Sequence, residues 1–359
     1  MKDKSPQGKF ESVGLKVSMR ARYIAIVSLI LLVLGILAYQ IQAVFVALVF
    51  SLTLASAIAP VAEWMEEKLK CPRPVSVALV YIATIVLYGA LVYFLYPTLK
   101  VQARELINSF PEYSKGISTH YQDLVSIVHE KAGLDPLSKD DVKAVVKGVT
   151  SRALTFTSDA ITALATGILV TFLTAYFVVE APEIWPRLLR WIPHEHRDRV
   201  AATIRPLESR LGGYVRGQML VSLAVGTFIG IGLKILGVQH ALLLAVLAGL
   251  LNLVPFVGSL LTAVLAVLVA FNQSVALAGC TVCLYMVEQW VESNFIVPQL
   301  LGTQVELHPL VVLFAILIGA SLMGLAGALI AVPIATATMY IAEEFYLEPL
   351  NKEQAPESE

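Results

Sequence analysis

The sequence has few charged residues and few cysteines for its length. Only 15% of its 359 residues are Asp, Glu, Lys or Arg, against roughly 25% in soluble domains, while 57% are hydrophobic. A water-soluble core cannot hide that much apolar surface, so the composition excludes a soluble enzyme. Three cysteines, Cys71, Cys280 and Cys283, are too few for a disulfide scaffold. The composition predicts an all-α, polytopic membrane protein.

Positive charge is also missing from one long part of the chain. No Lys or Arg lies between Lys234 and Lys352, and the formal net charge of the whole chain is -1. Nucleic-acid binding needs a basic excess, so we expect no nucleic acid partner. The sequence contains no nucleotide-binding or metal-ligand motif, and we therefore expect no enzyme activity, no cofactor and no metal site.

The N-terminal half is organised by three predicted features. Residues 1–22 form a basic tail, and residues 23–97 hold three predicted transmembrane helices. Residues 98–158 carry a balanced set of charges on a helical pattern, which predicts a small extramembrane amphipathic helical subdomain. A lipid-exposed stretch would not tolerate so many charges, so this subdomain lies outside the bilayer in the predicted topology.

The next segments fix the predicted orientation. Residues 159–180 form a fourth transmembrane helix, and residues 181–216 carry seven arginines beside Trp185 and Trp191. Arginine with tryptophan is typical of a segment at the membrane surface. The positive-inside rule places this segment and the N-terminus in the cytoplasm, followed at the other end by an acidic cytoplasmic tail, residues 343–359.

A predicted transport core, residues 217–342, contains two interrupted apolar stretches. Residues 241–271 are broken by Asn252, Pro255 and Gly258, and residues 308–341 are broken by glycines and a proline. Each is either one kinked span or a hairpin. Broken helices at membrane depth are tolerated only where they face protein or water, and paired ones point to a transporter's substrate site. For Gly319, Gly324 and Gly327 we favour simple close packing.

Polar side chains lie near these breaks. Glu288 and Glu292 are four residues apart in an apolar run, so they share one helix face. Carboxylates inside a membrane mark ion or proton pathways, unless Glu292 is solvated among the headgroups and Glu288 is paired with Arg or Lys from elsewhere. The candidate substrate or ion pathway consists of Asn252, Pro255, Gly258, Glu288, Gln289, Glu292 and Asn294.

Four motifs in order resemble those of the AI-2E family transporters. They are Gly249-Leu-Leu-Asn252-Leu-Val-Pro255-Phe-Val-Gly258, Glu292-Ser-Asn294-Phe-Ile-Val-Pro298, Leu307-His308-Pro309-Leu-Val-Val and Gly327-Ala-Leu-Ile-Ala-Val-Pro333. The chain departs from the family pattern at Ser259, where Pro is frequent, and at Ser293, where Gly is frequent. The resemblance implies a multi-pass protein of the cell inner membrane, and a homo-oligomer with five subunits as the expected number.

The resemblance also implies a secondary transporter involved in quorum sensing. The first expectation is export of a small neutral polar solute, such as an autoinducer-2-like signal molecule. An anionic cargo is disfavoured because the core has no positive side chain beyond Lys234. One alternative is a sodium or other cation/proton antiporter that uses Glu288 and Glu292. An alternative of another class is an oligomeric membrane scaffold that binds a partner through residues 98–158.

Overall fold

The computed structural model describes residues 42–132, 160–302 and 307–347, and this part of the chain is helical, with no strand. The chain divides into two compact units, Met1–Leu48 and Val49–Glu359. The first unit contributes to the described residues only the start of the helix Gln42–Leu69. The architecture below is that of the second unit, and the predicted all-α class is confirmed.

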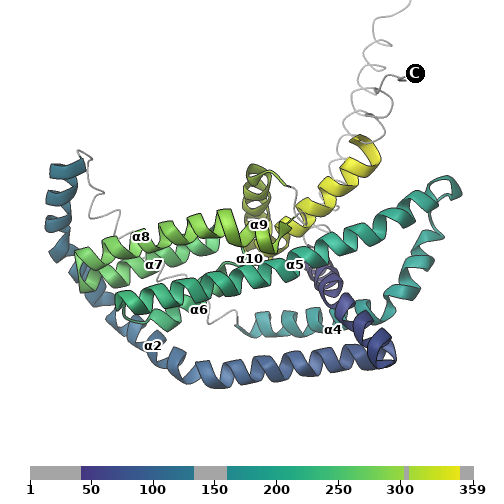
Figure 1. Cartoon of the computed structure of the whole chain (residues 1–359), viewed down its shortest axis with the longest axis horizontal. Coiled ribbons are helices and arrows are strands. Elements are labelled where there is room, and N and C mark those ends of the chain that lie inside the picture. The colour runs from purple at the N-terminus through teal and green to yellow at the C-terminus, as the bar shows by residue number, and fades with distance from the viewer. Residues whose placement is uncertain (1–41, 133–159, 303–306, 348–359) are drawn as a thin grey trace, which may run out of the picture. The chain divides into compact units, whose positions relative to one another are not determined.

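Two long helices follow, α2 (Arg73–Ala132) and α4 (Ala160–Leu189) (Figure 1). The sequence predicted a helix end at Pro97, but α2 continues through Pro97 into the segment that we expected to form a separate subdomain. A proline interrupts the backbone ladder without ending a helix when the flanking turns are maintained. The extramembrane location of residues 98–158 stays a prediction, and residues 133–159 lie outside the described part of the chain.

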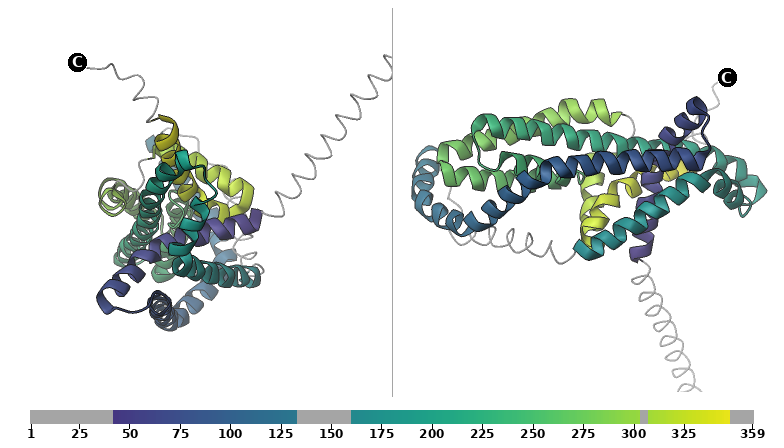
Figure 2. Two further views of the ribbon diagram at one scale, coloured as in Figure 1. Left: turned by 90° about the vertical axis from the view of Figure 1, so that its right-hand side faces the viewer. Right: turned by 90° about the horizontal axis from the view of Figure 1, so that it is seen from below.

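The helix α5 (His194–Leu236) organises the C-terminal half (Figure 2). It ends at Gly237, whose φ of 74° is the left-handed conformation that favours glycine at a helix end. One face repeats every four residues through Val221, Val225, Ile229 and Leu233, all with 0% exposure. This stripe belongs to a continuous apolar core that includes side chains from the following helices. The later helices therefore pack around α5.

The first broken stretch is a helical hairpin. It consists of α6 (Ala241–Leu251), a turn at residues 252–256 and α7 (Val257–Gln273), which packs back against α6. A Cβ on Gly258 would overlap the Leu251 carbonyl group, so only glycine permits this close return of the chain. The 11 residues of α6 reach about 16 Å, well short of the ~30 Å hydrocarbon core. We call this element the first hairpin.

The second broken stretch is also a hairpin, within α10 (Pro309–Ala342). Helical backbone angles are lost at Met323 and Gly324, and Gly324 has a φ of 59°. A Cβ on Gly319 would meet the carbonyl oxygen of Gly327, and these residues would be about 12 Å apart along a straight helix. Close packing is confirmed for Gly319 and Gly327, but it is wrong for Gly324, which forms the turn and has open space around it. We call this element the second hairpin.

Between the hairpins the chain forms α8 (Val275–Val291), the π-helix η1 (Glu292–Ile296) and α9 (Val297–Leu300), and a final π-helix η3 (Glu343–Leu347) follows α10. Within the described residues, four helical segments have the length and apolar composition needed to cross a membrane. They are Gln42–Leu69, Arg73–Leu106, His194–Leu236 and Pro309–Leu347. The last of these contains the second hairpin, so its chain reverses rather than continuing straight.

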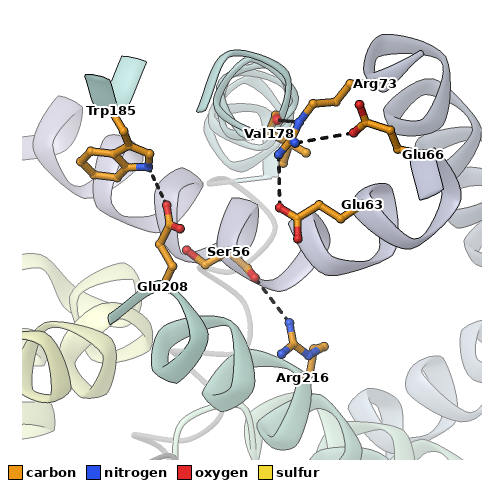
Figure 3. A network of polar contacts seen from close by, with 8 residues as sticks. All are labelled: Ser56, Glu63, Glu66, Arg73, Val178, Trp185, Glu208 and Arg216. Atoms are coloured by element: carbon orange, nitrogen blue, oxygen red, sulfur yellow. Dashed lines mark hydrogen bonds and ion pairs between the residues drawn. The ribbon is translucent and has the colours of Figure 1, made fainter. Parts of the chain in front are cut away.

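Two arginines complete helices that prolines have interrupted (Figure 3). Pro60 has no N–H to donate to the carbonyl of Ser56, and Arg216 on α5 donates to the Ser56 and Ala57 oxygens at 3.4 and 3.0 Å. Pro182 likewise releases the Val178 carbonyl, to which Arg73 Nε donates at 2.8 Å. Each freed carbonyl is thus bound by an arginine from another helix.

Candidate functional site

A buried polar network joins the turn of the first hairpin to two other helices. Asn252 caps the end of α6 and is 0% exposed. Its backbone oxygen accepts a hydrogen bond of 2.6 Å from Gln218 Nε2 on α5, and its Nδ2 donates to Glu292 Oε1 at 3.0 Å. One side chain therefore ties the hairpin turn to the carboxylate at the end of α8.

The two predicted carboxylates are both buried. Glu288 is 1% exposed and Glu292 is 7% exposed, which is rare for glutamate unless it is paired. Neither carboxyl oxygen of Glu288 has a hydrogen-bond partner among the described residues, and Asn252 Oδ1 has none either. The described part of the chain also contains no ion pair from Lys or Arg to these glutamates. The headgroup-solvated alternative for Glu292 does not match its burial.

The cluster therefore holds more acceptor oxygens than donors. Glu288 and Glu292 are four residues apart on one helix face, so the two carboxylates repel each other when both are charged. An unpaired carboxylate in a low-dielectric site is costly in free energy. A bound proton, or a small cation coordinated by several oxygens, removes that cost. The described residues offer no group of three or more His, Cys, Asp or Glu side chains for a metal ion. Two carboxylates and an amide oxygen suit a monovalent cation.

Hydroxyl and amide groups surround one side of this cluster. Ser259 Oγ lies 3.2 Å from Gln289 Oε1, joining α7 to α8, and Gln289 Nε2 lies 3.4 Å from Ser293 Oγ. Thr262 is fully buried on α7 and donates to the backbone of its own helix. Ser259 and Ser293, the two departures from the family pattern, are thus both in contact with Gln289.

The backbone beside Glu292 departs from α-helical geometry. The π-helix η1 begins at Glu292, and the N–H of Val297 donates to the Glu292 carbonyl. Pro298 follows directly and has no N–H for the carbonyl of Asn294, which explains why the regular ladder is not maintained here. Short π-helical segments are frequent at functional sites because they leave backbone groups and side chains in unusual positions.

The structure brings together most but not all of the predicted site residues. Asn252 and Glu292 are joined by a hydrogen bond, and Gln289 on the same helix as Glu288 instead binds Ser259 of α7. Pro255 and Gly258 shape the turn without supplying polar side chains. Asn294 is exposed, and its Nδ2 donates to the Trp290 carbonyl of its own helix, so it does not join the cluster.

Sequence reasoning missed Gln218 as a site residue. Its signal was a lone amide near the start of the apolar second half of α5, 34 positions before its partner Asn252. Only the tertiary contact shows that it binds the hairpin turn rather than facing the membrane surface.

A sequence profile of the AI-2E family transporters matches residues 26–347, which include all of these site residues. The chain belongs to the AI-2E family of transporters. Its sequence is 27% identical to YrrI of Bacillus subtilis over 84% of this chain and 86% of that protein. It is 29% identical to MT0215 of Mycobacterium tuberculosis, over 87% of this chain and 85% of that protein.

YhhT of Escherichia coli is 26% identical over 86% of each chain. All three relatives are named as candidate transport proteins. Together with the apolar helices, the family membership identifies this AI-2E protein as a multi-pass membrane transporter.

Proposed function

We propose that this AI-2E transporter is a cation/proton antiporter in which Glu288 and Glu292 bind, in turn, a proton and a monovalent cation such as Na⁺. The observation that carries the proposal is that the buried acceptor oxygens of Glu288 and Asn252 form no hydrogen bond within the described residues. A bound proton or a bound cation relieves the same deficit, so the two ligands compete for one site. Such competition is the basis of exchange.

The experiment is exchange by purified protein in liposomes. Vesicles are loaded with NaCl, diluted into Na⁺-free buffer, and a fluorescent dye reports the pH of the lumen. The antiporter acidifies the lumen as Na⁺ leaves, and Glu288→Gln abolishes the signal because the amide binds neither ligand. Glu183→Gln is the matched control, since Glu183 is an exposed carboxylate paired with Arg187. Full exchange by Glu288→Gln contradicts the proposal.

A second candidate is export of a small neutral polar solute, such as an autoinducer-2-like molecule. The observation in its favour is the row of amide and hydroxyl groups at Ser259, Gln289 and Ser293, which matches the hydrogen-bonding needs of a polyhydroxy compound. Flux of a radiolabelled cyclic polyol into vesicles without any sodium-dependent pH change favours this candidate over the antiporter.

We also propose that the protein lies in the inner membrane as a homo-oligomer, with both termini and residues 295–309 in the cytoplasm. Support for this orientation comes from the basic N-terminal segment and from the two hairpins, each of which reverses the direction of the chain. The test is thiol labelling of Gln299→Cys in a variant without Cys71, Cys280 and Cys283. An impermeant reagent applied outside intact cells should leave it unlabelled.

A further inference from the structure

A long apolar groove runs along α5, and neither Glu288 nor Glu292 is among its lining residues. It has a volume of about 920 Å³ and is lined by α5, α6 and the middle of α2. On α5 the lining extends from Met219 to Lys234, a length of about 22 Å. That length exceeds half of the ~30 Å hydrocarbon core, which is the depth of one lipid leaflet. The groove therefore has the dimensions of a single acyl chain.

Three glycines line the groove where α5 and α6 meet. Gly226 and Gly249 bring α5 and α6 together, and a Cβ on Gly226 would lie only 3.0 Å from the Ala245 carbonyl oxygen. A Cβ on Gly230 would lie 2.8 Å from the Ala245 Cβ. Larger side chains at these positions would push α5 and α6 apart, so the glycines keep the two helices in contact beside the groove.

The polar groups of the groove are few and lie apart from one another. Lys234 lines one end and forms no ion pair with the described residues. His240 lies nearby, and its Nδ1 is 3.7 Å from Glu105, which balances its charge when it is protonated. Gln102 is already engaged, because its Oε1 accepts from the Leu243 N–H at 2.9 Å. Lys234 is thus the cation at this end that the described residues leave unneutralised.

A buried hydroxyl marks the other part of the groove. Ser222 is 5% exposed, lines the groove, and its Oγ has no hydrogen-bond partner among the described residues. The large majority of buried side-chain polar atoms have a hydrogen-bond partner, so an unpartnered buried hydroxyl is unusual. Ser222 and Lys234 are 12 residues apart, about 18 Å along α5, so one polar headgroup cannot contact both.

We propose that the groove binds one acyl chain of an anionic phospholipid, with the phosphate beside Lys234. The apolar lining disfavours a polar solute, and no other Lys or Arg occurs between positions 235 and 351 to attract an anion elsewhere in this half of the chain. The bound lipid lies against α6, the arm whose end carries Asn252. Lipid binding is a property separate from ion exchange at Glu288 and Glu292.

Native mass spectrometry of the detergent-solubilised full chain tests the proposal. Phosphatidylglycerol and phosphatidylcholine with identical acyl chains are titrated in parallel. We expect the wild type to retain phosphatidylglycerol in preference, and Lys234→Gln to lower that preference about fivefold, as expected for one basic side chain at a lipid phosphate. Lys234→Arg keeps the preference, and so does Lys68→Gln, which removes an exposed lysine outside the groove.

A second variant separates the groove from the headgroup. Thr227→Trp fills the groove and should reduce retention of both lipids while Na⁺/H⁺ exchange by Glu288 persists. Equal binding of the two lipids by the wild type, or an unchanged preference in Lys234→Gln, overturns the proposal. It is also overturned if Thr227→Trp changes the subunit number without changing lipid retention, because a second copy of this chain would then cover the groove.

Discussion

The two hairpins share an architecture but differ in chemistry at their turns. The first hairpin turns through Asn252 and Pro255, and its turn is bound by Gln218 and Glu292 from other helices. The second hairpin turns at Met323 and Gly324, between Leu322 and Leu325, whose side chains are exposed. The first hairpin needs Gly258 for its close return, and the second needs Gly324 for the backbone angles of its turn. Within the described residues, only the first turn brings buried polar groups together. Backbone geometry and site chemistry are therefore separate requirements.

The largest expected effect is the loss of the close return in the first hairpin. Gly258→Ala places a methyl group onto the Leu251 carbonyl, a backbone group that cannot rotate away. We expect a loss of about 3 kcal/mol in the free energy of unfolding, at the upper end of overpacking costs. Thermal unfolding in detergent measures it.

The control for this prediction is Gly279→Ala on α8. A Cβ at Gly279 meets no atom within 4 Å, so alanine should stabilise the helix slightly. If both variants unfold at the wild-type temperature, the close return at Gly258 is not a constraint on the fold.

Substitution of Asn252 in the turn of the first hairpin should have the second largest effect on stability. Asn252→Ala removes the donor to Glu292 Oε1 and leaves a buried carboxylate without it. We expect a loss of about 2 kcal/mol in stability, together with a large fall in exchange rate in liposomes. Asn294→Ala, which removes an exposed amide bonded only to its own helix, should change either quantity little.

The apolar turn of the second hairpin should respond through stability alone. Gly324 has φ 59° and ψ -141°, a conformation almost restricted to glycine. Gly324→Ala should therefore lower the free energy of unfolding by about 1.5 kcal/mol. Exchange per folded molecule should persist, because the turn supplies no polar group to the carboxylates. An exchange defect as large as that of Asn252→Ala would erase the contrast between the two turns.

The smallest expected effect concerns the histidine before each hairpin. His240 precedes α6 and His308 precedes α10, where its Nδ1 accepts from the Leu310 N–H. Burial lowers the pKa of His240 below its ordinary value of 6.5, with Glu105 acting in the opposite direction. The folded state thus favours neutral His240. The free energy of unfolding therefore falls as the pH drops below about 6.5 toward the lowered pKa of the folded protein.

Unfolding temperatures measured between pH 7.5 and 5.5 test this. The wild type should lose more stability than His240→Gln over that range. An identical pH dependence in the two proteins would mean that His240 does not contribute.

The sequence predicted the two breaks because they are local, and left open whether each stretch is a kinked span or a hairpin. Asn252, Pro255 and Gly258 interrupt an apolar run, and the buried glutamates stand out in a segment with almost no charge. The chain's helical class and its membrane character followed from composition alone. These features depend on residue type and spacing, which a single sequence displays directly.

Contacts between distant segments could not be predicted in the same way. Gln218 reaches the hairpin turn, and Arg216 reaches the Ser56 carbonyl, across separations that leave no periodic signal. Pro97 suggested a helix end because proline removes one hydrogen bond, yet α2 continues past it. A proline shows where a helix loses one backbone hydrogen bond, but not whether the neighbouring turns keep the helix continuous.

The arginines at Pro60 and Pro182 have a mechanical consequence. In an ordinary helix every backbone hydrogen bond lies within the helix, so one helix can bend without changing the contacts of its neighbour. Here the hydrogen bonds missing at the Ser56 and Val178 carbonyls are supplied by Arg216 and Arg73, which belong to other helices. Bending at Pro60 must stretch or break the contact with Arg216, and bending at Pro182 must stretch or break the contact with Arg73. A bend in the helix Gln42–Leu69 is therefore coupled to α5, and a bend in α4 is coupled to α2.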